Sequence, residues 1–353
     1  MIKVNIFLRM PWKIKKVLQK MQNLYAFFMN KAYSKIYPPP SEKKILVFRK
    51  YYGESGGAIA LSEIVNLIST LGYSIEVITS PLNDLNSHYN KGIKFTNKAC
   101  GKYDLIICDD TSSAADINEL KNFGKVIVSC HCLYDKCHGR KPEEMQATLE
   151  SADLVQFVDE CQVESFGFSN KDFVVLPNPV SKIHIKTSSS GLGSVGDLDQ
   201  ERKNLATTVE IFKRSKAEKL ELWRCSNPFD EDKNIHSHHN WEKNKSRIFS
   251  SFSVLVFPSK FETFGLVVAE ALSAGIPCVI SNIPAFQHYK MCKAVQLIEP
   301  DDVNKGVRYA NEFLTRNDDL SEAAVEFWRL NYSPEVVRQK WQNTLTELMK
   351  KIR

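Results

Sequence analysis

The sequence predicts an α/β fold built from two doubly wound domains, each around a parallel sheet. Apolar runs of strand length alternate with segments of helical periodicity along most of the chain, a pattern typical of parallel strands connected by helices. A length of 353 residues exceeds what one hydrophobic core usually holds. Small polar residues from Thr187 to Gly191 separate two alternating halves, and we place the hinge at about residues 181–191.

The composition favours a folded, soluble protein. Hydrophobic residues make up 43% of the chain and charged residues 25%, which excludes both a disordered and a membrane-embedded class. The nine cysteines are an odd number, and no secretory signal pattern precedes them. We therefore expect a reducing, cytoplasmic compartment.

Residues 1–40 form a basic amphipathic segment with a charge of +8 and no acid, which leaves −2 for the rest of a chain whose net charge is +6. From Pro11 to about Tyr37 apolar residues recur at helical spacing, and lysines lie mostly off that stripe. The pattern favours a helix lying on an anionic membrane surface at the inner face. A helix packed on the protein, or a flexible basic tail, is the alternative. No apolar run is long enough to span a bilayer.

The first Rossmann-like domain is expected to cover residues 41–185. Its strands are predicted at residues 45–48, 75–79, 104–108, 125–129, 154–158 and 173–176, and its helices at 58–71, 111–123, 143–151 and 160–166. Gly56 and Gly57 lie between the first strand and the first helix. A strand, a glycine loop and a helix turn backbone N–H groups towards an anion, although glycines also make ordinary turns.

The fourth predicted strand is followed by Cys130, His131 and Cys132. Thiolates and imidazoles are preferred zinc ligands. The spacing matches no common paired-ligand pattern, so we do not expect zinc here. His131 would lie at the carboxyl end of a buried strand, either as a substrate-binding residue or as a structural histidine.

The second Rossmann-like domain is expected to cover residues 190–320, followed by C-terminal helices at 321–353. Its strands are predicted at residues 193–196, 219–223, 254–257, 278–281 and 294–298, and its helices at 205–215, 243–252 and 264–274. We expect His236, His238 and His239 to lie in a polar loop, because their spacing gives them no common face. Pro334 should break or restart the C-terminal helical segment.

The most informative stretch runs from Phe257 to Ser281 and reads as strand, loop, helix and strand. Such a unit implies a right-handed crossover between parallel strands. Glu262 would lie in the loop after the first strand and Glu270 in the helix. Both therefore belong to the edge of the sheet where open α/β folds bind ligands.

This stretch resembles the nucleotide-sugar site of the retaining glycosyltransferases of GT-B architecture, family 4 type, also called glycosyl transferases group 1. The family pattern E-x-F-G-x-x-x-x-E-A, followed by A-x-G-x-P-V, is matched here by Glu262-Thr263-Phe264-Gly265, Glu270-Ala271 and Ala274-Gly275-Ile276-Pro277. The resemblance extends over most of residues 45–300. It implies two facing Rossmann-like domains with a cleft between them, and C-terminal helices that cross back to the first domain.

The resemblance also implies roles for the residues of this stretch. Glu262 would contact the sugar hydroxyls or the reacting face, and Glu270 the ribose of the nucleotide. Main-chain N–H groups at Phe264 and Gly265 would meet the diphosphate, where a helix N-terminus offers donors and partial positive charge. Gly265 would also leave the phosphate room to approach.

Five further residues gain roles from the same resemblance. Gly56 and Gly57 match the glycine loop that lies at the interdomain cleft in the family, and His131 matches a histidine close to the donor sugar. Family members hold the diphosphate with an arginine and a lysine. Here Lys203, with Arg202 as its neighbour, would supply the cation that a departing diphosphate needs, or both lie in a solvated charged turn.

The sequence departs from the family at one position, because Asp197 stands where the arginine is expected. One of the two cations that bind the diphosphate in the family is therefore absent here, unless another basic residue replaces it. No D-x-D pair is placed to hold a metal on the donor: Asp109 and Asp110 are adjacent, and Asp197 and Asp199 lie in the cation turn itself. We therefore expect neither a metal nor a cofactor.

These observations together predict a retaining glycosyltransferase. It would transfer a sugar from a nucleotide diphosphate to a glycan or lipid-linked envelope acceptor by same-face substitution, with no nucleic-acid partner. One alternative is an enzyme of the same architecture but other chemistry, such as an epimerase or a phosphorylase. Another is a catalytically degenerate partner or binding subunit, a reading favoured by Asp197 alone.

Overall fold

The computed structural model describes residues 43–49, 56–79, 84–136, 139–168, 172–185, 190–226, 232–240, 242–315 and 317–351. The predicted basic segment, residues 1–40, lies outside them. The chain divides into two compact units. The first consists of Met1–Phe157, Ser165–Val175 and Trp341–Arg353, and the second of Val158–Glu164 and Leu176–Lys340.

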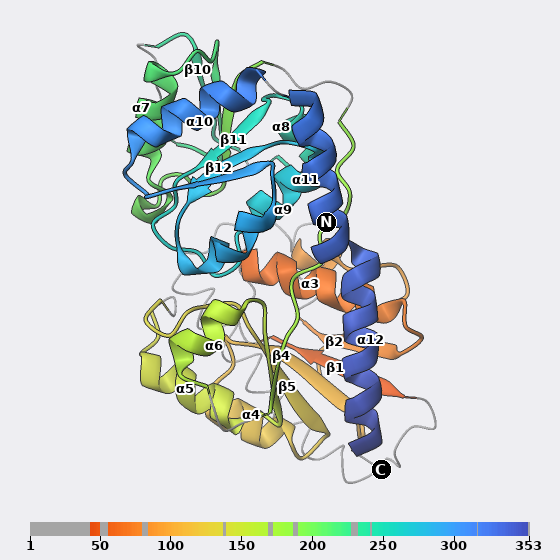
Figure 1. Cartoon of the computed structure of the whole chain (residues 1–353). Helices are drawn as coiled ribbons and strands as arrows, with labels where there is room; N and C mark the ends of the chain where they lie inside the picture. Colours follow the sequence, from red (N-terminus) through yellow and green to blue (C-terminus); the bar gives the residue numbers. More distant parts are fainter. Residues whose placement is uncertain are drawn as a thin grey trace, which may run out of the picture. The chain divides into compact units, whose positions relative to one another are not determined.

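The first unit is built on a seven-stranded parallel sheet with the strand order β3-β2-β1-β4-β5-β6-β7 (Figure 1). The strands are β1 (Lys44–Phe48), β2 (Ser74–Ile78), β3 (Lys94–Thr96), β4 (Leu105–Asp109), β5 (Lys125–Cys130), β6 (Leu154–Phe157) and β7 (Phe173–Val175). The helical segments are α3 (Gly56–Ser69), η1 (Asp84–His88), α4 (Ala114–Leu120), α5 (Pro142–Ser151) and α6 (Glu160–Phe166). The residues of α6 up to Glu164 belong to the second unit.

Sequence and structure agree closely in this unit, because its central strands are buried on both faces and read as continuous apolar runs. The differences have local causes. Helix α4 begins at Ala114, later than predicted, because Ser113 and Asp116 form a capping box that starts the helix there. Strand β3 was missed because it is short and largely exposed, with Phe95 44% accessible.

The second unit contains a six-stranded sheet with the order β10-β9-β8-β11-β12-β13, again with all strand pairs parallel. The strands are β8 (Leu192–Val195), β9 (Leu220–Trp223), β10 (Ile235–His238), β11 (Val254–Phe257), β12 (Cys278–Ser281) and β13 (Val295–Ile298). The helical segments are η2 (Glu201–Lys203), α7 (Leu205–Arg214), α8 (Lys245–Phe249), α9 (Leu266–Ala274), η3 (Pro284–Met291), α10 (Val303–Thr315), α11 (Asn317–Asn331) and α12 (Pro334–Lys351). Helix α12 begins in this unit, and its residues from Trp341 on belong to the first unit.

One prediction for this unit was wrong. The histidine-rich segment is strand β10 and not a polar loop. Alternation along the strand places His236 and His238 on one face, where both meet the carboxylate of Glu221 on β9. The prediction that Pro334 restarts the C-terminal helix is confirmed, because α11 ends at Asn331 and α12 begins at Pro334.

Both sheets have the doubly wound order in which the chain starts at a central strand, extends to one edge and then continues on the other side. The reversal falls between β1 and β4 in the first unit and between β8 and β11 in the second. Loops at the carboxyl ends of these central strands diverge, and ligands of open α/β sheets bind there. The fold class predicted from the sequence is therefore confirmed.

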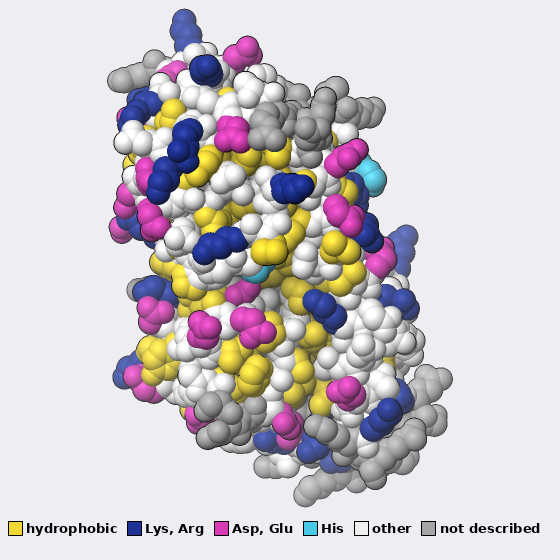
Figure 2. Space-filling view, in the orientation of Figure 1, with side chains coloured by type: hydrophobic (Ala, Val, Ile, Leu, Met, Phe, Trp, Pro, Cys, Tyr) yellow, Lys and Arg dark blue, Asp and Glu magenta, His cyan; other side chains and the backbone are white. Residues whose placement is uncertain are grey.

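The surface carries mixed charge. On the face drawn in Figure 2, basic and acidic side chains are interspersed with one another and with hydrophobic ones, as is typical of a solvated surface. Among the described residues, no helix combines the length and the apolar character that crossing a membrane requires.

Candidate active site

The loops after β8 and β11 meet at the topological switch point of the second sheet. The loop after β8 ends in η2, which carries Arg202 and Lys203, and the loop after β11 carries Glu262. Two hydrogen bonds join the loops: the amide N of Lys260 and the hydroxyl of Ser259 donate to the carbonyl O of Arg202, at 2.7 and 3.0 Å. These contacts hold the predicted donor-binding residues of separate segments in one place.

Glu262 is the centre of this cluster. Its Oε1 accepts hydrogen bonds from Lys203 Nζ at 2.5 Å, Arg202 Nη1 at 2.8 Å and Ser259 Oγ at 2.9 Å. The side chain of Glu262 is 10% exposed and that of Lys203 7%, so this is a desolvated ion pair. The structure thus brings together three residues that the sequence assigned to the donor site.

Lys203 is held as a buried cation at the end of a rigid turn. Burial lowers its pKa, and the nearby Glu262 carboxylate raises it again in part. The ammonium lies 4.5 Å from the centre of the Phe257 ring. The next residue, Asn204, has a left-handed backbone, and its side-chain amide donates to the carbonyl O of Pro300 at 2.9 Å. Such a cation, placed in advance and little hydrated, is suited to binding an anion.

Gly265 has a steric role in addition to its predicted one. It caps α9 with φ +75°, and a Cβ built on it would lie 2.4 Å from Cε1 of Phe286. Only glycine satisfies both conditions. Phe264 is buried and packs edge-on against Tyr332 at 5.4 Å between ring centres. The loop therefore delivers the N-terminus of α9 to the switch point in a fixed conformation.

Glu270, in the second turn of α9, forms an ion pair with Lys245 at 2.8 Å. Lys245 is the first residue of α8 and is 45% exposed. No local pattern in the sequence marks Lys245. Its contact with Glu270, 25 positions further along the chain, depends on the packing of helices α8 and α9. Glu270 does not bond to the Glu262 cluster in the described contacts, but it faces the helix that leads to the neighbouring pocket.

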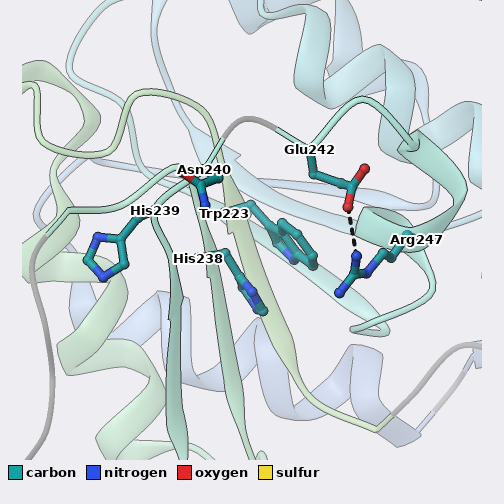
Figure 3. Close-up of a pocket in the computed structure, with 6 residues that line it drawn as sticks. All are labelled: Trp223, His238, His239, Asn240, Glu242 and Arg247. Carbon is teal, nitrogen blue, oxygen red and sulfur yellow. Dashed lines mark hydrogen bonds and ion pairs between the residues drawn. The ribbon is translucent and has the colours of Figure 1, made fainter.

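This pocket lies at the carboxyl ends of β9 and β10 and has a volume of about 270 Å³. Figure 3 shows the residues that line it: Trp223, His238, His239, Asn240, Glu242 and Arg247. The rings of Trp223 and His238 are stacked, with centres 3.8 Å apart and planes inclined by 8°. Such a flat aromatic wall suits a planar ring.

Hydrogen bonds from behind orient the pocket wall. Trp223 Nε1 donates to Ser251 Oγ at 3.0 Å. Glu221, which is nearly buried, bonds to His238 Nε2 at 2.8 Å and to His236 Nδ1 at 3.0 Å. Burial raises the pKa of Glu221, but hydrogen bonds from the two histidines and from Lys219 lower it below its ordinary value. The sequence marks this pocket only by His236, His238 and His239, whose spacing predicts a polar loop.

The predicted residues of the first unit also come together in part. A Cβ added to Gly57, in the first turn of α3, would lie 3.2 Å from Cβ of His131, so glycine permits this close approach. His131 follows β5, its Nε2 is 2.9 Å from Ser129 Oγ, and its amide N donates to Asp110 Oδ2 at 2.7 Å. Burial lowers the pKa of His131. A side chain at Gly56 would meet open space.

The cysteines beside His131 lie close to Asp110. Strand β5 ends at Cys130, and the chain bends at Cys132. As a result the ligand atoms of Asp110, Cys130 and Cys132 all lie within 4.8 Å of one another. A structural zinc site uses four ligands, and the described residues supply three here.

Comparisons with known proteins agree with this arrangement. Residues 189–316 match the family described as glycosyl transferases group 1. The O-antigen biosynthesis glycosyltransferase WclY of Escherichia coli is 27% identical over 105 residues, which span only 29% of this chain and 29% of that protein.

Solved structures resemble a larger part of the chain. Sucrose-phosphate synthase from Thermosynechococcus elongatus superposes with a TM-score of 0.71 at 15% identity, covering 88% of this chain and all of the other. Anabaena HepE in complex with UDP and glucose gives a TM-score of 0.68 at 11% identity, covering 87% and 100%. At these identities the likeness establishes the fold.

The family match covers η2, the loop after β11 and helix α9, the segments that form the cluster around Glu262. The fold likeness covers both units. Residues 189–316 therefore match the glycosyl transferases group 1 family, and the chain has a fold of the GT-B class.

Proposed function

We propose that this protein is a retaining glycosyltransferase that transfers a sugar from a nucleotide diphosphate donor to a glycan or lipid-linked envelope acceptor. The observation that carries the proposal is the desolvated cluster of Glu262, Lys203 and Arg202 at the switch point of the second sheet, inside the segment that matches the family. The family, the O-antigen relative and the UDP-bound neighbour support a nucleotide-sugar donor.

In this proposal the two cations bind the donor diphosphate. Without a ligand, Glu262 is the counter-ion of Lys203. A diphosphate brings two or more negative charges to the same cations, which frees the carboxylate of Glu262 to accept hydrogen bonds from sugar hydroxyls. The N-terminus of α9, opened by Gly265, adds main-chain donors and partial positive charge where the leaving group gains charge.

The nucleoside end of the donor would extend from Glu270 towards the pocket of Trp223 and His238. Glu270 would bind the ribose, with Lys245 holding the carboxylate. The volume of about 270 Å³ and the stacked wall suit one planar base. The pocket is too small for a whole nucleotide sugar.

The remaining assignments follow the sequence. His131, Gly56 and Gly57 would act near the donor sugar and the acceptor, and the phosphate oxygens of the leaving group would take the acceptor proton. Lys203 and Arg202 would neutralise the diphosphate without a metal. Residues 1–40 would hold the enzyme on an anionic membrane surface near a lipid-linked acceptor.

Nucleotide release tests the proposal directly. Purified protein is incubated with UDP-, GDP- and ADP-sugars and an envelope glycan or lipid extract, and released nucleotide diphosphate is measured with and without EDTA. We expect release from one donor class that depends on the acceptor, survives EDTA and is abolished in Glu262→Ala. Binding of the donor without turnover on any extract would refute the enzymatic assignment.

Membrane contact needs a separate test. Full-length protein and a variant lacking residues 1–40 are sedimented with vesicles prepared with 30% anionic lipid. We expect only the full-length protein to co-sediment, and to be released by salt. Equal co-sedimentation of the two proteins would contradict this part of the proposal.

A binding subunit without catalysis is the second candidate, and it has one observation in its favour. Asp197 stands where the family keeps a cation, and its carboxylate lies near Lys203 closely enough to raise the pKa of that lysine. A negative charge there opposes diphosphate binding unless another cation offsets it.

A further inference from the structure

The turn after β8 is hydrogen-bonded to the segment that follows β9. The amide N of Gly196 donates to the carbonyl O of Trp223 at 3.2 Å, and that of Leu198 to the carbonyl O of Arg224 at 3.1 Å. On the other side, the amide N of Arg224 donates to the carbonyl O of His238 at 2.8 Å. Arg224 therefore lies between the Asp197 turn and the aromatic pocket.

The backbone of Arg224 is strained. Among the described residues, the non-glycine residues with positive φ are Asn204 (54°) and Arg224 (63°). Asparagine tolerates the left-handed region, but arginine has no side-chain group that stabilises it. Strain of this kind persists only where surrounding contacts impose it, and it gathers at functional sites. Here the three hydrogen bonds around Arg224 impose it, at the carboxyl edge of the sheet.

The side chain of Arg224 points to Asp197. Its Nη2 is 3.7 Å from Asp197 Oδ2, and the two side chains are 40% and 35% exposed. Asp197 also accepts a hydrogen bond from Gln200 Nε2 at 2.7 Å. A long, half-exposed ion pair contributes little, so exchanging Asp197 for a stronger anion gives up little of this contact. The buried pair of Lys203 with Glu262 contrasts with it in both distance and burial.

Charge around Gly196 is the third observation. A Cβ on Gly196 would lie 3.6 Å from Nζ of Lys203, and Gly196 immediately precedes Asp197. The turn thus lies between Lys203 on one side and Arg224 on the other. Arg202, Lys203 and Arg224 thus place three cations around the turn, each paired with a carboxylate, Glu262 or Asp197, that a stronger anion could displace.

We propose that Arg224 is a third anion-binding residue of this site, which leaves Asp197 and binds the diphosphate of the donor. The inference rests on the proposed function and supplies the cation that Asp197 displaces from the turn. A guanidinium binds phosphate oxygens through two parallel N–H groups and stays charged at any physiological pH. Asp197 then forms an ion pair with Arg224 when no anion is bound, and its negative charge weakens anion binding.

Arg224→Gly is the decisive variant, because glycine adopts φ of +63° without strain. We expect its unfolding free energy to equal or exceed that of the wild type, which separates loss of the side chain from loss of the fold. Affinities for inorganic pyrophosphate, for UDP, GDP and ADP, and for the three nucleosides are measured by titration calorimetry. Arg214→Ala, which removes a half-exposed arginine paired with Glu210 at 4.0 Å outside the site, is the control.

We expect Arg224→Gly to weaken pyrophosphate and the preferred nucleoside diphosphate about tenfold, the factor that corresponds to about 1.4 kcal/mol. Nucleoside affinity and the control variant should be unchanged. Asp197→Asn should tighten pyrophosphate binding, and much of that gain should vanish in the Arg224→Gly background. Unchanged pyrophosphate affinity in Arg224→Gly, or an equal loss for nucleosides, would overturn the inference.

The same experiment distinguishes this inference from the proposed function. Pyrophosphate binding that depends on Arg224, in a protein that releases no nucleotide from any sugar donor, would uphold the anion site and refute the transferase. Equal turnover of a donor by the wild type and by Arg224→Gly would uphold the transferase and refute the anion site. A wild-type protein that binds neither pyrophosphate nor any nucleoside diphosphate would refute both.

Discussion

Replacing Glu262 by glutamine keeps the shape of the side chain and removes the negative charge that Lys203 and Arg202 share. Lys203 then keeps a hydrogen-bond acceptor but loses its counter-ion inside the protein. Removing one partner of a buried ion pair costs about 3–5 kcal/mol in unfolding free energy, and the retained amide places this variant near the lower end. We therefore expect Glu262→Gln to lose about 3 kcal/mol, a large part of the 5–15 kcal/mol typical of a domain.

Urea denaturation followed by tryptophan fluorescence measures this loss, with Glu270→Gln as the matched control. Glu270 lies on the same helix-loop unit, but its partner Lys245 is 45% exposed, so we expect the control to lose less than about 1 kcal/mol. Both substitutions replace one carboxylate oxygen by an amide nitrogen. The difference between their losses of unfolding free energy therefore reports the effect of burying the ion pair.

The pH dependence gives a second check. Burial already lowers the pKa of Lys203, and Glu262 opposes that shift. Without the carboxylate the pKa falls further, so the folded variant loses the proton at a lower pH than the unfolded chain does. The destabilisation of Glu262→Gln should therefore shrink as the pH rises from 7 to 9.

Anion binding should change in the opposite sense to stability. Because Glu262 competes with a diphosphate for Lys203, Glu262→Gln should bind pyrophosphate more tightly than the wild type while losing sugar transfer. Pyrophosphate at 100 times its dissociation constant should then restore about 2.7 kcal/mol of stability. A loss no greater than that of Glu270→Gln, or one that grows with pH, would refute this account of the cluster.

Three further predictions concern other parts of the two units. Gly265→Ala should lose roughly 2–3 kcal/mol of unfolding free energy, measured by thermal or urea unfolding, because it adds left-handed strain to a clash with Phe286. In Gly56→Ala the added methyl group meets open space, so this variant should lose less than half of that. Equal losses would contradict the steric argument. Since burial lowers the pKa of His131, protonation favours the unfolded chain, so wild-type stability should fall between pH 7 and 5, with a smaller fall in His131→Gln; parallel pH profiles would contradict this. Trp223→Leu should weaken nucleoside binding about tenfold and leave pyrophosphate affinity unchanged, because Trp223 backs the His238 ring on which a base would stack, and such stacking is worth about 1–3 kcal/mol; an equal effect on pyrophosphate would place the base elsewhere.

Most of the strands could be predicted, because strands such as β4 and β11 are unbroken apolar runs and each is followed by a helical period. The same regularity placed Glu262 in the correct loop. Where side chains and exposure decide the structure, prediction failed. Strand β10 has the sequence Ile-His-Ser-His, which lacks an apolar run, and it forms because β9 pairs with it and Glu221 accepts both imidazoles.

The site was predictable as a set of residues but not as a set of contacts. The spacing of Glu262 and Glu270 pointed to the donor site, whereas the three hydrogen bonds on Glu262 come from two segments about 60 residues apart. Lys245 and Arg224 carry no motif. Their proximity to Glu270 and Asp197 follows from which strands are neighbours in the sheet, and this no local pattern records.

The pocket wall at His238 has a consequence for how the site adapts. Strand β10 is an edge strand, bonded to β9 on one side only in the described sheet. Edge elements open locally with less free energy than central ones, so backbone amides of β10 should exchange with deuterium faster than those of β8 and β11. The wall that contacts a bound ring can therefore shift at less cost than the strands that carry the Lys203 cluster. Because Arg224 N donates to the carbonyl O of His238, such a shift would be felt at Arg224 before it reached Lys203 and Glu262.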